Sequence, residues 1–167
     1  MALAQAVAYL VDAGESVASY RVLLADRATT LDHLAPDTLP DEQATGLAAA
    51  WSLSIDRADT LRPIGLARPM LHLASLLDPN GIPQTVLTSQ AVRDHLAAHR
   101  AAAEASPELA AVSPADATRT LRALDRLSLI DHQPTTPHQT VRVQPTRRGC
   151  WAKTTPTPSR PGATSPM

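Results

Sequence analysis

The chain has 167 residues, enough for one modest core, and 44% of them are hydrophobic, as in an ordinary globular domain. There is no phenylalanine and aromatic residues total 2%, so Leu, Ala, Val and Ile must fill the core, which favours packed helices over a sheet sandwich. Four of the 15 lysines and arginines lie in residues 145–167, so the rest of the chain has 11 basic against 16 acidic residues. This acidic body argues against nucleic acid as a partner.

Cysteine usage and the first residues bear on the compartment. Cys150 is the sole cysteine, so an intramolecular disulfide is excluded and a cytoplasmic protein is the simplest interpretation. The apolar stretch from Met1 to Val11 has no basic leader and ends at Asp12, which is too short to span a bilayer. We therefore expect a buried helix there, and neither a signal nor a membrane contact.

Three helices are predicted in the first part of the chain. The first spans Leu3–Asp12, and Gly14 follows it as a left-handed cap. Ser16 caps the second, which we expect to end near Ala28 with its arginines turned outward. A loop follows over residues 29–41, which contain two prolines. The third helix is expected over Glu42–Ala58, with Trp51 as its main anchor.

The next segments predict a second group of helices. The run that begins at Pro69 is apolar almost all round and ends at the turn-forming residues 78–83, so it indicates a buried central helix. A short helical turn at Val86 and Leu87 and an Ala-rich helix over about residues 89–105 follow.

A helix start is predicted at Ser113, because a capping Ser, a Pro at the first helical position and Asp116 in the first turn follow one another. This helix should end near Leu127, and the segments 129–132 and 140–143 then indicate a hairpin. The sequence thus predicts a mainly α fold, a helical bundle ending in a winged helix with a small β-hairpin. We assign residues 1–58 to a helical subdomain, 59–144 to a winged-helix-like domain and 145–167 to a disordered Pro/Thr-rich basic tail.

The motifs of common catalytic sites are absent from the sequence. A Walker A motif needs Gly-Lys before Ser or Thr, and the only lysine, Lys153, follows Ala152. The six glycines are too scattered for a dinucleotide loop, and no serine lies in Gly-x-Ser-x-Gly. Acids at helix ends, such as the pair Asp12 and Glu15, are interpreted as end-of-helix residues facing solvent. We therefore predict a protein that is not an enzyme, with no catalytic or cofactor-binding residue.

Two side-chain clusters allow a binding interpretation. His95 and His99 lie one helical turn apart, as two zinc ligands would. However, Leu96 stands where a zincin has its glutamate, and no third ligand is evident. We therefore predict solvated histidines and no metal site. The arginines Arg119, Arg122 and Arg126 share one face of the capped helix. In the alternative interpretation, a stand-alone winged-helix DNA-binding regulator, that face would contact phosphates; we favour a solvated or partner-facing stripe.

Six segments together resemble the bacterial NB-ARC type of STAND NTPase with C-terminal tetratricopeptide repeats, and they span roughly residues 2–143. The match lies after that family's Gly-Leu-Pro-Leu motif. Its most specific segment, residues 73–83, is similar to the family's Leu-Leu-Asp-Pro-Asp-Gly-Ile-Pro. The others are Ala2–Leu10, Ser16–Leu24, Ala49–Ile55, Ala123–Ile130 and Thr140–Val143.

The resemblance implies a signal-transduction role. In that family a helical subdomain and a winged helix pack on a nucleotide-binding domain and hold an ADP-bound switch closed, and exchange for ATP accompanies opening and oligomerisation. The implied partners are the nucleotide-binding and repeat domains of a parent or related protein, or further copies in a homo-oligomer. ADP or ATP would bind that nucleotide-binding domain, so no cofactor is expected in this chain. Such a piece regulates only if it interacts differently with the two nucleotide states.

The sequence departs from the family in one important place. The family's wing strand continues into Val-His-x-Leu-Val-Gln, whose histidine senses the nucleotide phosphates, whereas Val143 here precedes Gln144 and Pro145. The family pattern ends at this point, and the Walker motifs are missing before Ala2. We therefore expect a truncated fragment that lacks the sensor histidine.

Overall fold

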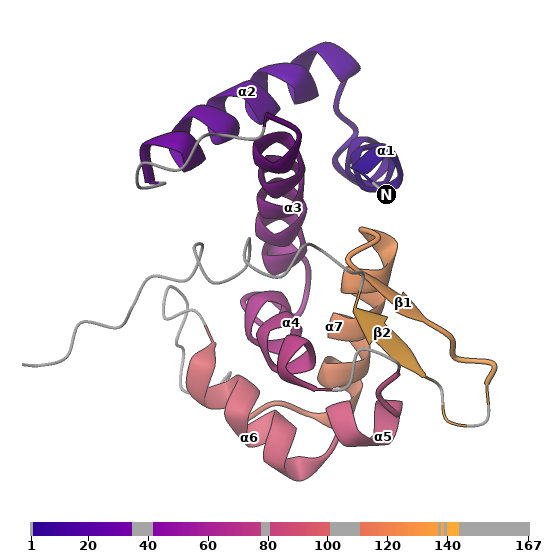
Figure 1. Ribbon diagram of the computed structural model, residues 1–167. Coiled ribbons are helices and arrows are strands. Elements are labelled where there is room, and N and C mark those ends of the chain that lie inside the picture. The colour runs from indigo at the N-terminus through magenta and orange to yellow at the C-terminus, as the bar shows by residue number, and fades with distance from the viewer. Residues whose placement is uncertain are drawn as a thin grey trace, which may run out of the picture.

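The computed structural model describes residues 2–34, 42–77, 81–100, 111–136, 138 and 140–143. In this part of the chain, seven helices and one two-stranded antiparallel sheet make a mainly α-helical fold (Figure 1), which confirms the predicted fold class at that level. None of the described helices is both long and apolar enough to span a membrane. The predicted tail, residues 145–167, lies outside the described residues.

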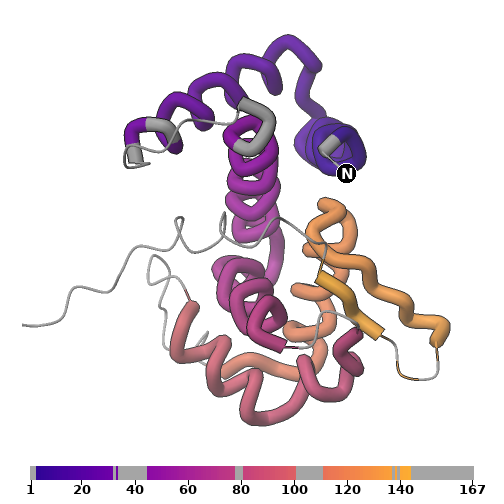
Figure 2. The backbone as a smooth tube through the Cα atoms, viewed as in Figure 1, coloured from indigo at the N-terminus to yellow at the C-terminus, as the bar shows by residue number. Residues whose placement is uncertain are grey.

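The first three helices form an arm. Helices α1 (Ala2–Ala13) and α2 (Val17–Leu34) each pack on α3 (Glu42–Thr60), which runs from them toward the rest of the molecule (Figure 2). Gly14 ends α1 with φ +67°, a left-handed conformation that glycine adopts without strain. At the start of α2, the Ser16 hydroxyl accepts a hydrogen bond from the Ser19 amide, as the sequence predicted for a cap.

Helix α2 is longer than predicted. The hydroxyls of Thr29 and Thr30, expected in a loop, donate hydrogen bonds to the carbonyls of Ala25 and Asp26 one turn earlier, so both threonines remain within the helix. The prediction of an end near Ala28 was therefore wrong, because it treated threonine as a helix breaker when its side chain can bond along the helix. Of the predicted loop, residues 35–41 lie outside the described part.

A second group of four helices follows, namely α4 (Ala67–Leu76), α5 (Gln84–Leu87), α6 (Gln90–His99) and α7 (Pro114–Arg126). Helix α4 lies against α3, α6 and α7 (Figure 1), and Met70 and Leu71 are fully buried, as predicted for a central helix. Pro69 sits in its first turn, where a proline removes no helical hydrogen bond. The predicted Ala-rich helix ends at His99, and residues 101–110 are not among those described.

The predicted hairpin consists of β1 (Ile130–His132) and β2 (Val141–Val143), paired antiparallel with His132 opposite Val141. Ile82 forms a bridge on the other side of Val141, with both backbone hydrogen bonds at 2.8 Å. Gly81 precedes the bridge at φ +146°, and a Cβ there would collide with the Thr140 side chain. The segment before α5 is thereby joined to the hairpin.

One hydrophobic cluster holds α3 to the four-helix group and the hairpin. Among the described residues it includes none from α1 or α2, so its first member along the chain is Trp51, the predicted anchor of α3. The arm therefore depends on α3 and on polar contacts for its position. The largest fully buried members are Leu66, Met70, Leu71, Leu87, Leu96, Leu121, Leu124, Leu127, Leu129, Ile130 and Val141.

Candidate docking surface

Helix α7 begins where the sequence predicted, at a complete capping box. The Ser113 hydroxyl accepts from the Asp116 amide at 3.1 Å, and the Asp116 carboxylate accepts from the Ser113 amide at 3.2 Å. The Ser113 hydroxyl also donates to this carboxylate at 2.6 Å, and this bond, with a smaller contribution from Arg119, lowers the pKa of Asp116. The cap fixes the first turn of the helix that carries the three predicted arginines.

These three arginines all lie on the exposed side of α7, opposite the buried Leu121 and Leu124, but two of them form ion pairs with other described residues. Arg119 pairs with Asp116 at 3.1 Å, and Arg126 pairs with Asp12 of α1 at 2.5 Å. Arg122 is exposed and makes no hydrogen bond or ion pair with any described residue. Two of the three predicted phosphate contacts are therefore occupied within the chain.

Asp12 was expected to face solvent at a helix end, and this expectation was wrong. Its side chain is 1% exposed because it lies between two helices that each supply an arginine. Arg57 of α3 bonds its carboxylate through Nε at 2.7 Å and its backbone carbonyl through Nη2 at 3.1 Å, and Arg126 of α7 approaches the other carboxylate oxygen. A carboxylate held by two guanidinium groups joins three helices.

Gln5 lies two turns before Asp12 on the same face of α1 and makes a second contact with the end of α7. Its side chain is buried, and its Nε2 donates to the Ser128 carbonyl at 3.4 Å. The seven-residue spacing of Gln5 and Asp12 was the only signal in the sequence that α1 has a polar inner face. The identity of the partners depends on tertiary structure and could not be predicted.

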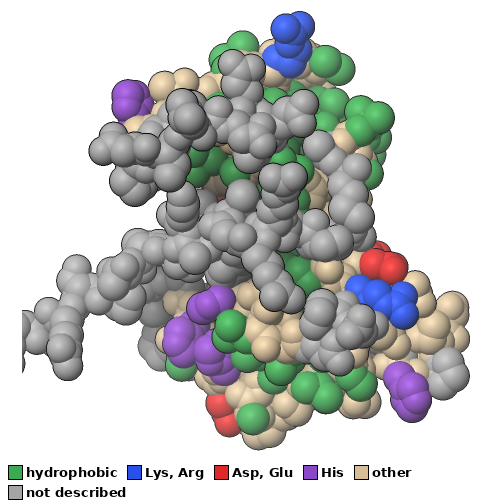
Figure 3. Space-filling view, viewed as in Figure 1, with side chains coloured by type: hydrophobic (Ala, Val, Ile, Leu, Met, Phe, Trp, Pro, Cys, Tyr) green, Lys and Arg blue, Asp and Glu red, His purple; other side chains and the backbone are tan. Residues whose placement is uncertain are grey.

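The outer face of α1 is apolar and uncovered by described residues. Leu3, Val7 and Val11, spaced four residues apart, are 77%, 51% and 78% exposed, so the prediction that this helix is buried was wrong. Val17 and Val22 on α2 are also mostly exposed. Hydrophobic side chains gather over the part of the molecule formed by α1 and α2 in Figure 3. We call Leu3, Val7 and Val11 the outer stripe; an apolar stripe of this kind is typical of a docking surface.

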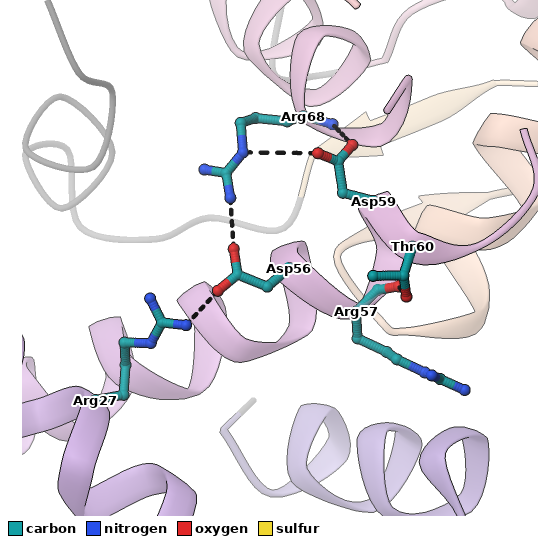
Figure 4. A network of polar contacts seen from close by, with 6 residues as sticks. All are labelled: Arg27, Asp56, Arg57, Asp59, Thr60 and Arg68. Atoms are coloured by element: carbon teal, nitrogen blue, oxygen red, sulfur yellow. Dashed lines mark hydrogen bonds and ion pairs between the residues drawn. The ribbon is translucent and has the colours of Figure 1, made fainter. Parts of the chain in front are cut away.

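A second ionic network joins α2 and α4 to α3 (Figure 4). The Asp56 carboxylate of α3 accepts from Arg27 of α2 and, at 2.5 Å, from Arg68 of α4. Asp59, one turn further along, accepts from the Arg68 amide at 3.1 Å. Arg27 was predicted to turn outward, and this was wrong because α3 presents a carboxylate to it. Since these side chains are about one-third exposed, the network orients the helices more than it stabilises them.

The predicted histidine pair is stacked. The rings of His95 and His99 on α6 have centroids 4.0 Å apart, and His99 Nδ1 lies 2.9 Å from the His95 carbonyl oxygen. Burial, followed by the neighbouring His99 and His72, lowers the pKa of His95. Within the described residues, no group of three or more His, Cys, Asp or Glu side chains is arranged to hold a metal ion.

Comparison with known proteins gives no relative: no protein-family model, no curated protein and no solved structure matches the chain. The resemblance to NB-ARC proteins therefore stays a prediction that rests on the sequence segments alone. The outer stripe is the surface feature from which a function can be argued.

Proposed function

We propose that the chain is a non-catalytic regulatory module, a helical unit joined to a winged helix, that packs on the nucleotide-binding domain of an NB-ARC type STAND protein and controls its ADP/ATP switch. The outer stripe of α1 is the observation that carries this proposal. Its three side chains are exposed at helical spacing on a helix whose opposite face is already attached to α3 and α7. A neighbouring domain would remove the stripe from water.

The order of elements after α3 supports the winged-helix part of the proposal. Helix α4 is followed by the Ile82 bridge, then by α5 and α6, the capped helix α7 and the hairpin β1–β2. Helices followed by a capped helix and a β-hairpin are the arrangement expected of a winged helix, a variant of the helix-turn-helix. The bridge between Ile82 and Val141 holds the segment before α5 against the hairpin.

The state of the arginine face favours regulation over the second candidate, a stand-alone DNA-binding regulator. Arg119 and Arg126 are engaged by Asp116 and Asp12, which leaves Arg122 as the only unengaged guanidinium on that face among the described residues. Non-specific DNA affinity rises with the number of phosphates that a protein neutralises, and one arginine supplies little. A surface that mixes acids with bases in this way suits a protein partner better.

The test is nucleotide-dependent binding. We expect the chain to bind a separately produced NB-ARC nucleotide-binding domain loaded with ADP at least about tenfold more tightly than the same domain loaded with a non-hydrolysable ATP analogue, because only differential affinity can shift the switch. Replacing Val7 and Val11 by Ser should abolish the binding, which isothermal titration calorimetry would measure. Val86→Ser is the matched control, since Val86 is 42% exposed but lies on α5.

Equal affinity for the two nucleotide states, or binding that survives the Val7 and Val11 changes, would contradict the proposal. The rival function has its own signature in a gel-shift measurement. If the chain retards duplex DNA, loses this affinity steeply as salt is added, and loses it entirely in Arg122→Glu, the DNA-binding function replaces the regulatory one.

A further inference from the structure

Helix α1 packs on α3, and its Tyr9 ring contacts Tyr20 of α2, but its contacts with the end of α7 are polar. None of its described residues belongs to the hydrophobic cluster, and its inner face reaches α7 through the Asp12–Arg126 ion pair and the Gln5–Ser128 hydrogen bond. Its outer face is the apolar stripe of Leu3, Val7 and Val11. The position of α1 over the end of α7 therefore depends on a few charged and amide groups.

We propose that α1 is a releasable strap and that Asp12 is its latch. In the closed state Asp12 accepts from Arg57 and pairs with Arg126, so that one carboxylate fastens α1 to both α3 and α7. In the released state α1 leaves α7, while the cluster formed by α3, the four-helix group and the hairpin stays intact. Release returns the Arg126 guanidinium to solvent beside Arg122, one turn earlier on the same helix.

The surroundings of Asp12 keep the free energy needed to release α1 small. A buried carboxylate loses its hydration, and its attraction to two guanidinium groups must first offset that loss, so the net stabilisation from such a pair is small. Arg126 is 63% exposed and Arg57 is 34% exposed, so both are hydrated again as soon as Asp12 leaves. The Gln5 Oε1 atom is buried without a hydrogen-bond partner among the described residues, and release would let it bond to water.

The latch couples the two faces of α1. If the outer stripe docks on a nucleotide-binding domain, a step that rests on the proposed function, movement of that domain would draw α1 away from α7 and break the Asp12–Arg126 pair. The coupling is reciprocal, because a partner that prefers the released helix binds more tightly when the latch is already broken. The existence of the latch itself can be measured in the isolated chain, where no partner is present.

Amide hydrogen exchange of the full chain tests the latch. We expect Asp12→Asn to speed exchange of the α1 amides by about tenfold or more and to leave the slowest amides of α4 and α7 unchanged, because local release does not require global unfolding. Arg126→Gln is the milder variant, since Asp12 keeps Arg57, and it should speed α1 exchange several-fold. Arg122→Gln is the matched control on the same face of α7, and it should change nothing.

Three results would overturn the latch. Unchanged α1 exchange in both Asp12→Asn and Arg126→Gln would mean that Asp12 does not hold the strap. Equal acceleration in α1, α4 and α7 would mean that the residues act on global stability and not on release. If the double variant exchanged faster than Asp12→Asn by the full Arg126→Gln factor, the two residues would act independently. Because amide exchange is measured on the chain without a partner, its outcome does not depend on whether the chain binds a nucleotide-binding domain.

Discussion

The arm formed by α1 and α2 and the unit that runs from α4 to β2 bury their apolar side chains to different extents. In the unit, Met70, Leu121 and Val141 have no exposed surface, whereas Val11 on α1 and Val22 on α2 are 78% and 69% exposed. Helix α3 belongs to both regions, because its C-terminal half enters the hydrophobic cluster while α1 and α2 pack along it. The difference teaches that buried apolar side chains hold the unit together, whereas packing on α3 and ion pairs position the arm.

The largest expected effect comes from a change in the core. Leu124→Ala should lower the free energy of unfolding by about 2–5 kcal/mol, because it removes a fully buried side chain and leaves a cavity. Val11→Ala on the outer stripe should change it by less than about 0.5 kcal/mol. Urea unfolding of both variants measures the contrast. A loss of more than about 1 kcal/mol in Val11→Ala would break the comparison, because it would show the stripe to be buried in the free chain.

Removing the helix-capping hydroxyls of Ser113 and Ser16 should have an effect on stability of intermediate size. Ser113→Ala removes the hydroxyl of the α7 capping box and should cost about 1 kcal/mol of global stability, because α7 carries part of the core. Ser16→Ala removes the hydroxyl that accepts from the Ser19 amide at the start of α2. Since α2 lies outside the cluster, we expect Ser16→Ala to speed amide exchange in α2 and to shift the urea midpoint less than Ser113→Ala. Equal midpoint shifts would indicate that the arm and the unit unfold together.

The smallest expected effect is a pH dependence confined to the unit. The pKa of His95 is lowered, first by burial and then by His99 and His72, so the folded state binds fewer protons there than the unfolded state. Its contribution to stability is present above the unfolded pKa of about 6.5 and is lost as the pH falls below it. Thermal unfolding between about pH 7.5 and 5.5 should therefore be less pH-dependent in His95→Gln than in the wild type.

The predicted elements of the unit succeeded where local chemistry determines structure. Ser113, Pro114 and Asp116 specify a helix start through hydrogen bonds within four residues, and the structure has that start. The end of α2 was misplaced because threonine hydroxyls can either interrupt a helix or bond along it, and the sequence does not distinguish the two. Local signals were therefore reliable for helix caps and less so for helix ends.

The features on which the proposals rest depend on contacts between distant parts of the chain. The arginine face was predicted from the spacing of Arg119, Arg122 and Arg126, but the capture of Arg126 by Asp12 was not, because nothing in the sequence pairs the end of α1 with the end of α7. The apolar residues of α1 predicted a helix, which is present, but the expectation that this helix is buried was wrong because described residues cover only its polar side.

The bridge between Ile82 and Val141 has a consequence for the order in which the chain folds. It joins β2 to a strand residue that precedes α5, α6 and α7, so the unit closes only when the last described residues arrive. The Asp12–Arg126 pair spans a still longer stretch of chain than this bridge, and closing a longer loop costs more entropy. We therefore expect the contact between α1 and α7 to form late in folding, after the bridge has closed the unit.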